Sequence, residues 1–245
     1  MTISGWSEQY DIIREEFGYD YNLDLQSATL LDSMLKDVDY TTKLHDMIHE
    51  KTVFVLGAGP SLNSTIHIAN KYSATKIVAD GAAQAIIHND MKAEIIVTDL
   101  DGDPDSLKTA AQHGSLMVVH AHGDNMDKLN MVNDFPNCIG TTQTNSVGKV
   151  DNFGGFSDGD RCVFLASHFG AKNIILFGMD FGEKIGKYSK GIVENKELKL
   201  KKLRRGEILL EWLAEKTTSK IYTISNTPKY FQQLNITQLD KLFSR

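Results

Sequence analysis

The chain has 245 residues, of which 41% are hydrophobic and 24% are charged, and its formal net charge is -6. This profile is typical of one large soluble domain, or of one domain with a helical addition. Because acidic residues are in excess, general binding to nucleic acid or to an anionic membrane is not expected. The two cysteines, Cys138 and Cys162, are too few for a disulfide framework. We find no signal peptide and no apolar run of about 20 residues, and we expect a cytoplasmic protein.

Taken in chain order, the predicted elements indicate an α/β fold. Residues 1–50 read as an N-terminal helical cap, followed by a catalytic domain at residues 51–245. Strands are expected at 53–56, 76–79, 95–97, 116–120, 138–139, 173–177 and 221–224, and helices at 62–72, 82–89, 104–113, 125–133, 160–169 and 207–216. Short apolar strands without alternation, separated by helices, indicate a Rossmann-like, mostly parallel sheet with helices on both faces.

The segment 93–105 carries aspartates at alternate positions, Asp99, Asp101 and Asp103, directly after an apolar strand. In an extended chain alternate side chains share a face, so at least Asp99 and Asp101 should point the same way. Two carboxylates about 4 Å apart repel by roughly 4 kcal/mol at an effective dielectric of about 20, and a cation between them removes that cost. Carboxylates at a strand end suit Mg²⁺. The alternative is an ordinary Asp/Gly/Pro turn.

The turn at residues 57–61, GAGPS, joins an apolar strand to a predicted helix. Glycines there let backbone amides approach a phosphate at the positive end of the helix. Leu62 replaces the third glycine of the dinucleotide fingerprint and no P-loop lysine follows, so the turn belongs to neither common type. The alternative is a tight turn in which Ser61 caps the helix. Asp80-Gly81, at the next strand end, is expected to contact a ribose or a neighbouring group.

Two polar loops also follow strands or precede helices. Residues 120–125, HAHGDN, suggest either a zinc site or a polar wall of a pocket, and no cysteine or third histidine lies at zinc-ligand spacing. Residues 152–161, NFGGFSDGDR, either cap a helix with an acid or offer aromatic rings and an acid to a flat heterocycle. Residues 182–205 are basic and read as a solvated helix face or as a lid.

The ordered motifs GAGPSL, VADGA, VTDLDGD, HAHGDN, GFSDGDR and ILFGMDFG, within residues 50–215, resemble the archaeal-type 6-hydroxymethyl-7,8-dihydropterin pyrophosphokinase family. The resemblance implies transfer of the β,γ-diphosphate of ATP to the pterin hydroxymethyl group, with AMP released and Mg²⁺ required, in the biosynthesis of tetrahydromethanopterin or folate-type cofactors. The implied partners are the small molecules ATP and pterin, without nucleic acid or membrane. The oligomeric state stays open, and a homo-oligomer is among the options.

The resemblance also implies roles for individual residues. Asp99 and Asp101 would bind Mg²⁺ and carry catalysis, with help from Asp103. The nucleotide-binding residues would be Gly57, Gly59, Pro60, Ser61, Asp80, Gly81 and Lys187. The pterin side would be lined by Asp124, Asn125, Asp158 and Asp180. The segment Gly182–Lys202 is expected to be a mobile lid over the phosphates, because it holds glycines and lysines but few apolar anchors.

Other enzymes share parts of this pattern. The ADG and TDLDGD motifs resemble thiamin pyrophosphokinase, whose aspartates hold Mg²⁺, although Thr98 and Gly102 depart from its motif. Residues 155–182 are similar to sialyltransferase-like glycosyltransferases, and Asp-Leu-Asp fits their metal motif. A non-catalytic nucleotide-binding module would not need so many strand-end carboxylates. The products separate these classes of protein. A pyrophosphokinase releases AMP, a glycosyltransferase forms a nucleotide and a glycoside, and a non-catalytic module forms no product.

Overall fold

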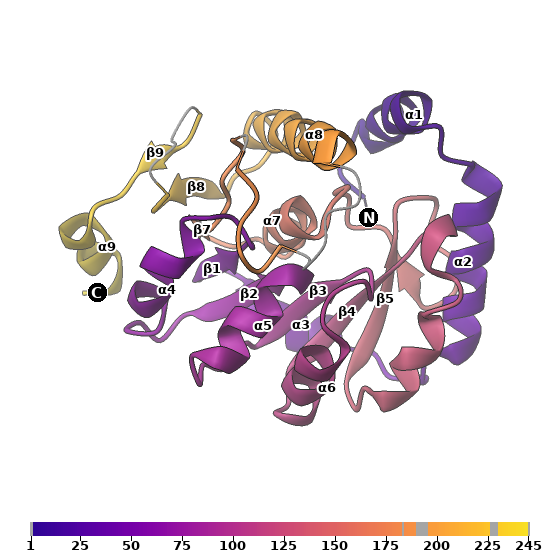
Figure 1. Ribbon diagram of the computed structural model, residues 1–245, viewed down its shortest axis with the longest axis horizontal. Helices are drawn as coiled ribbons and strands as arrows, with labels where there is room; N and C mark the ends of the chain where they lie inside the picture. Colours follow the sequence, from indigo (N-terminus) through magenta and orange to yellow (C-terminus); the bar gives the residue numbers. More distant parts are fainter. Residues whose placement is uncertain (1, 183, 190–195, 226–229, 245) are drawn as a thin grey trace.

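The computed structural model describes residues 2–182, 184–189, 196–225 and 230–244, and in this part of the chain nine strands form one sheet (Figure 1). The strand order is β6-β5-β4-β3-β2-β1-β7-β8-β9, and every neighbouring pair is parallel. The strands are β1 (Thr52–Leu56), β2 (Thr75–Ala79), β3 (Ile95–Thr98), β4 (Leu116–Ala121), β5 (Cys138–Thr142), β6 (Val150–Asp151), β7 (Asn173–Phe177), β8 (Lys220–Thr223) and β9 (Gln232–Gln233). All carboxyl ends therefore lie along one edge, where open α/β sheets bind ligands.

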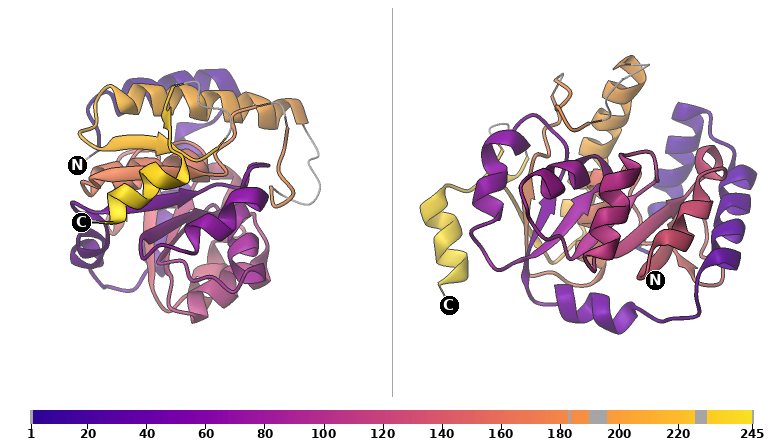
Figure 2. Two further views of the ribbon diagram at one scale, coloured as in Figure 1. Left: turned by 90° about the vertical axis from the view of Figure 1, so that its left-hand side faces the viewer. Right: turned by 60° about the horizontal axis from the view of Figure 1, so that its bottom comes forward.

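Helices cover both faces of the sheet, which gives two hydrophobic cores (Figure 2). Successive strand residues point to opposite faces, so β1 places Phe54 and Leu56 in one core and Val53 and Val55 in the other. The first core is closed by α2 (Tyr21–Met34), α4 (Leu62–Ala69), α5 (Asp80–His88), α6 (Pro104–Gln112) and α9 (Ile236–Phe243). The second is closed by α1 (Trp6–Phe17), α3 (Thr41–Ile48), α7 (Asp158–His168) and α8 (Lys196–Ala214). The predicted fold class is confirmed.

The N-terminal segment is helical, as expected, and its helices are divided between the two faces. Helix α2 packs on β4, β5 and β6, whereas α1 lies beside α8 above α7 (Figure 1). The contact between α1 and α8 is ionic: Glu16 pairs with Arg205 and with Lys201. The division of the chain into two domains at residue 50 stays a prediction. In the described part of the chain no helix has the length and apolar character that crossing a bilayer requires.

One predicted helix is wrong in type. Residues 125–133 were expected to form an α-helix, but the chain instead forms two 3₁₀ segments, η1 (Gly123–Asn125) and η2 (Leu129–Asp134). The buried residues of η2 are Leu129 and Val132, and a spacing of three matches a 3₁₀ helix as well as an α-helix. The two-residue strands β6 and β9 and the helix α9 carried no clear sequence signal and were not predicted.

Candidate active site

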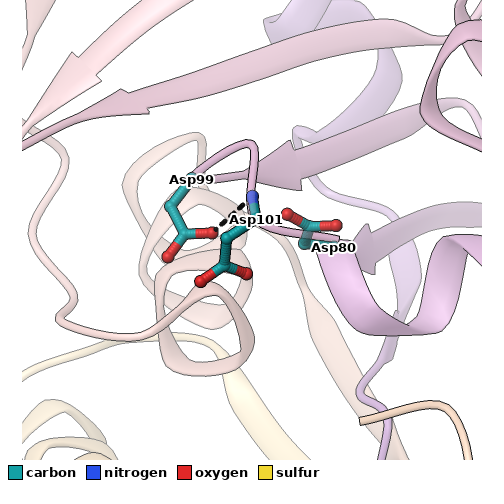
Figure 3. A group of neighbouring side chains, drawn as sticks. All are labelled: Asp80, Asp99 and Asp101. Carbon is teal, nitrogen blue, oxygen red and sulfur yellow. Dashed lines mark hydrogen bonds between the residues drawn. The ribbon is translucent and has the colours of Figure 1, made fainter. Parts of the chain in front are cut away.

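Three carboxylates converge at the carboxyl ends of β2 and β3. Asp80, Asp99 and Asp101 each offer one oxygen, and these oxygens all lie within 4.8 Å of one another (Figure 3). Asp80 is buried, while Asp99 and Asp101 are half-buried. Oxygen donors of this kind suit Mg²⁺, which takes one or two carboxylates and keeps positions for water and substrate phosphates. The residues present therefore fit a divalent cation.

A left-handed turn, and not an extended chain, brings Asp99 and Asp101 together. Leu100 between them has φ 66°, and it is buried in the first core. The turn is fixed at both sides: the amide of Leu100 donates to Thr98 Oγ1 at 2.8 Å, and the amide of Asp101 donates to Asp99 Oδ1 at 3.2 Å. A non-glycine residue in this conformation carries backbone strain, which is characteristic of functional sites. The prediction that the two carboxylates share a side is confirmed, but its stated reason is wrong.

Asp80 is held in place by the loop that follows β3. Its Oδ2 accepts hydrogen bonds from Thr98 Oγ1 at 2.7 Å and from the amide of Gly102 at 3.1 Å. The sequence analysis expected Asp80 to contact the nucleotide, whereas the structure makes it the third member of the carboxylate cluster.

Asp103 is not part of the carboxylate cluster that the described residues form, and its predicted metal role stays a prediction. It precedes α6, and its Oδ2 accepts hydrogen bonds from the amide of Ser106 at 2.9 Å and from the Ser106 hydroxyl at 2.5 Å. With Pro104 at the start of the helix, this is an ordinary helix N-cap. Asp103 is exposed and faces away from the cavity described next.

The cluster opens into a cavity of about 600 Å³. Asp99, Asp101 and Asp158 are among the residues that line it. Burial raises the pKa of Asp158 well above its ordinary value, and the nearby carboxylates of Asp99 and Asp80 raise it further. Asp158 therefore lies close to the carboxylate cluster, and its predicted contact with the pterin stays a prediction.

On one side of the cluster, the cavity wall is formed by the turns that follow β1, β2 and β7. These turns pack closely against one another. Gly57, Gly59 and Gly81 line the cavity, as predicted. A Cβ added at Gly59 would lie 2.5 Å from the carbonyl oxygen of Gly178, and one at Gly57 would lie 2.8 Å from the same atom. The glycines are therefore required by the approach of the turn after β7.

The amides of the 57–61 turn donate mostly within the protein. The amides of Gly57 and Gly59 donate to the carbonyls of Phe177 and Gly178, each at 2.8 Å. The amide of Ser61 donates to Asp180 Oδ2 at 2.7 Å, so a carboxylate occupies the start of α4 where a phosphate was expected. In the structure these amides are thus engaged by β7 and its turn, and the expected phosphate-binding role stays a prediction.

The remaining residues of this turn are also placed differently from the prediction. Ser61 does not cap α4 through its side chain, because its hydroxyl pairs with that of Ser225 at 2.9 Å. Neither Pro60 nor Ser61 lines the cavity, whereas Asp180 does, so Asp180 lies on the side of β1 and β7 and not on the expected pterin side.

Neither Asp124 nor Asn125 lines the cavity, and their predicted contacts with the pterin stay predictions. Asn125 is buried, and its Nδ2 donates to the carbonyls of Asp99 at 2.8 Å and His120 at 2.7 Å, so it shapes the loop behind the cluster. Asp124 is exposed and does not line the cavity. Its amide donates a hydrogen bond to His122 Nδ1 at 3.3 Å.

The predicted lid is described only in part, since residues 183 and 190–195 lie outside the described residues. Lys187 is exposed and does not line the cavity; its ammonium lies 5.5 Å from the ring centroid of Tyr188. Lys184 lines the cavity instead. The segment lies directly on the 57–61 turn, because a Cβ at Gly186 would be 2.0 Å from the carbonyl oxygen of Ala58.

The other side of the cavity, beyond β4 and β5, contains residues that the sequence analysis missed or left undecided. Tyr19, Asp24, His122, Gln143 and Phe156 line it. In the sequence, the loop HAHGDN alone indicated a polar wall of a pocket, and His122 of this loop does line the cavity. No motif marked Tyr19 or Asp24, because they reach the cavity only through the packing of the N-terminal segment against β4, β5 and β6. Gln143 directly follows β5, but no motif of that segment marked it.

His120, which also lines the cavity, forms a buried pair with Arg161 on this side. Arg161 Nη2 lies 3.1 Å from His120 Nε2 and 2.7 Å from the carbonyl of Gly155. Because Arg161 can only donate, His120 Nε2 accepts, and His120 Nδ1 donates to the carbonyl of Thr141 at 3.3 Å. Burial, and then the guanidinium of Arg161, hold the pKa of His120 well below its ordinary value, so this histidine is neutral.

The fold and the site together define a class of protein. A parallel α/β sheet with a cation-ready carboxylate cluster in a cavity at the strand ends is typical of enzymes that act on phosphate-containing substrates. The sequence profile of the family described as 6-hydroxymethylpterin diphosphokinase MptE-like matches residues 27–186. The chain belongs to this family, as the sequence motifs predicted.

Curated relatives match over most of the chain. A protein of Pyrococcus furiosus named 6-hydroxymethyl-7,8-dihydropterin pyrophosphokinase is 43% identical, with 92% of this chain and 100% of the relative covered. Proteins of the same name from Methanocaldococcus jannaschii and Methanothermobacter thermautotrophicus are 41% and 39% identical, over 88% and 87% of this chain and 97% and 95% of the relatives. At this identity the overall architecture is shared.

Among solved structures, the MAf glycosyltransferase of Magnetospirillum magneticum is similar in fold, with a TM-score of 0.53 at 12% sequence identity. The likeness covers 89% of this chain and 42% of that one, so the chain corresponds to less than half of the glycosyltransferase. At this identity the likeness concerns the fold alone.

Proposed function

We propose that this protein transfers the β,γ-diphosphate of ATP to the hydroxymethyl group of 6-hydroxymethyl-7,8-dihydropterin and releases AMP. The observation that carries the proposal is the carboxylate cluster of Asp80, Asp99 and Asp101, two members of which line the cavity, in a chain about 40% identical to relatives named for this activity. The product belongs to the biosynthesis of folate-type or methanopterin-type cofactors.

In this reaction the hydroxymethyl oxygen attacks the β-phosphorus and loses its proton. The bond between the β-phosphorus and the oxygen bridging it to the α-phosphate breaks, and AMP leaves with that oxygen. The protein has little covalent chemistry to perform, so its work is positioning and neutralisation of charge. Asp80, Asp99 and Asp101 would hold Mg²⁺, which when bound neutralises phosphate charge.

The two sides of the cavity suit the two reactants. Strand order places β2, β1 and β7 on one side of β3 and places β4 and β5 on the other, so the cluster lies between the two walls. The glycine-lined side, with Lys184 at its rim, would take the nucleotide. The carboxyl of Asp158, which lines the cavity near Asp99, would face the hydroxymethyl group and the β-phosphorus.

The test is an analysis of products. The protein incubated with ATP, Mg²⁺ and 6-hydroxymethyl-7,8-dihydropterin should form AMP and pterin diphosphate in equal amounts. Formation of ADP instead would identify an ordinary kinase. Turnover of a sugar nucleotide without consumption of ATP would favour a glycosyltransferase, and turnover of thiamin in place of pterin would favour a thiamin pyrophosphokinase. Chelation with EDTA should stop the reaction, and added Mg²⁺ should restore it.

A further inference from the structure

The N-terminal segment contributes to the wall of the cavity on the side of β4 and β5. Tyr19, from the loop between α1 and α2, and Asp24, from α2, both line it. The position is fixed by a hydrogen bond between Asp24 Oδ1 and the amide of Gly123, at 2.7 Å, in the loop that follows β4. This side of the cavity is therefore incomplete without residues that precede the first strand.

One part of this wall is aromatic. The ring centroids of Tyr19 and Phe156 lie 6.2 Å apart, and Phe156 lies 5.0 Å from Phe17. The ammonium of Lys202, on α8, lies 5.6 Å from the ring centroid of Tyr19 and 5.9 Å from that of Phe156. Tyr19, Phe156 and Lys202 all line the cavity. Aromatic walls of this kind bind flat rings by stacking.

The other part of the wall is a buried carboxylate. Asp24 is 3% exposed, and its Oδ2 accepts hydrogen bonds from the Tyr10 hydroxyl at 2.5 Å and from Gln143 Nε2 at 2.6 Å. With the bond from Gly123, three donors of the described chain reach this carboxylate, and a carboxylate accepts about four hydrogen bonds. A cavity-lining, buried acceptor with capacity left on Oδ1 is suited to a ligand N–H donor.

The loop after β4 joins this carboxylate to the cluster. Gly123 donates to Asp24, and the preceding residue, His122, has its Nε2 at 3.8 Å from Asp99 Oδ2. A ligand whose donor edge contacts Asp24 therefore extends along His122 toward Asp99. That geometry matches an acceptor substrate whose recognised edge lies at one end and whose reacting group lies at the other.

We infer that Asp24, with the rings of Tyr19 and Phe156, forms the subsite for the amino-pyrimidinone half of the pterin. This inference rests on the proposed function. A pterin presents an amino group and a ring N–H side by side, and the remaining capacity of Asp24 Oδ1 can accept from this donor edge. Adenine presents an acceptor nitrogen beside its amino group, which a carboxylate would repel. Asp24 thus selects the pterin and excludes the base of ATP from this side.

The test compares Asp24→Asn with Tyr10→Phe. Both changes remove a hydrogen bond from the same buried cluster, but Tyr10 does not line the cavity. Asp24→Asn should raise KM for the pterin about tenfold or more, because a charge-assisted bond is lost, and should leave KM for ATP unchanged. Tyr10→Phe should leave both values near those of the wild type. Equal effects of the two variants on pterin KM, or a rise in KM for ATP, would overturn the assignment.

A second comparison does not depend on how well Asp24→Asn folds. Wild-type protein should bind a pterin analogue that lacks the 2-amino group about tenfold more weakly than the pterin itself, and Tyr19→Ala should weaken both equally, because stacking does not read the amino group. Equal affinity of the wild type for pterin and analogue would overturn the role of Asp24.

Binding is measured by pterin fluorescence without ATP. If the pterin binds in this manner but no AMP forms with ATP and Mg²⁺, the proposed reaction fails and the subsite stands. If AMP forms but the analogue binds as well as the pterin, the subsite fails and the reaction stands.

Discussion

Gly102 packs directly against Asp80. The amide of Gly102 donates to Asp80 Oδ2 at 3.1 Å, and a Cβ added to residue 102 would lie 1.7 Å from Asp80 Oδ1. The loop after β3 therefore holds the third carboxylate of the cluster through its backbone, and only a glycine leaves room for that carboxylate. In the Asp-Leu-Asp-Gly sequence, the glycine at the fourth position therefore leaves room for Asp80, which lies at the start of α5.

We predict that Gly102→Ala displaces Asp80 and weakens binding of the divalent cation. Activity should fall by about a hundredfold, and the Mg²⁺ concentration for half-maximal activity should rise. Both are measured by AMP formation across a Mg²⁺ titration.

Gly114→Ala is the matched control for this prediction. Gly114 has φ 93° and its added Cβ would meet nothing within 4 Å, so alanine there costs stability through backbone strain, of the order of 1 kcal/mol, without touching the site. The control should unfold at a lower temperature and keep its Mg²⁺ response. A Gly102→Ala protein with the Mg²⁺ response of the wild type would contradict the role given to this contact.

Asp99→Asn and Asp101→Asn should each lower activity by about a hundredfold or more at saturating Mg²⁺, while the fold survives. Asparagine keeps the size of the side chain but removes the charge, and removing one of two neighbouring carboxylates relieves their repulsion. Thermal unfolding should therefore occur at the same temperature as in the wild type, or higher. Wild-type turnover by Asp101→Asn would exclude the residue from the metal site.

Asp103→Ala separates the third aspartate of the motif from the first two. It removes the side-chain cap of α6, which costs about 1 kcal/mol in the free energy of unfolding. Because Asp103 lies outside the cavity, kcat and KM should change less than twofold (roughly the resolution of such measurements). A loss of activity as large as that of Asp101→Asn would restore Asp103 to the metal site.

The parallel sheet and the proximity of Asp99 and Asp101 could be predicted because both depend on local patterns. Apolar runs that end in Gly or Asp marked the carboxyl ends of the strands, and the alternating aspartates marked two of the three clustered carboxylates. The left-handed Leu100 could not be predicted, because leucine has no preference for that conformation and the buried position of its side chain imposes it. The hydrogen bond between Asp180 and Ser61 could not be predicted for a related reason, since it depends on how the turns of β1 and β7 meet.

Asp24 illustrates the other limit. It lies in the first turn of α2, where an acid is expected simply because it faces the positive end of the helix, and the packing of α2 against β4 and β5 turns it inward. Its partners Tyr10, Gly123 and Gln143 are distributed over more than 130 positions of the chain, with separations of 14, 99 and 119 residues from Asp24. No spacing rule in a single sequence identifies such a set.

The buried pair of His120 and Arg161 predicts a pH dependence of stability. The pKa of His120 in the folded state is well below 6.5, so the folded chain leaves it neutral while the unfolded chain takes up a proton below about pH 6.5. The contribution of His120 is fully present above that pH and is lost as the pH falls below it, with a slope of up to about 1.4 kcal/mol per pH unit.

Urea unfolding at pH 7.5 and at lower pH values measures this dependence. In His120→Gln the glutamine oxygen can still accept from Arg161, and the titrating group is gone, so stability should fall less steeply with decreasing pH than in the wild type. Identical slopes for the two proteins would show that His120 is not the group responsible.

The final prediction concerns the lysine that faces the nucleotide side. Lys184 and Lys187 are both exposed, but only Lys184 lines the cavity, and the backbone of Gly186 between them packs against Ala58. Lys184→Ala should raise KM for ATP about tenfold, because a cation opposite a phosphate is removed, and Lys187→Ala should change it little. Amide exchange at residues 184–189 should slow when an ATP analogue and Mg²⁺ are added, since the bound phosphates hold this segment against the 57–61 turn. Equal kinetics of the two variants, together with exchange that does not respond to the nucleotide, would show that the segment plays no part in nucleotide binding.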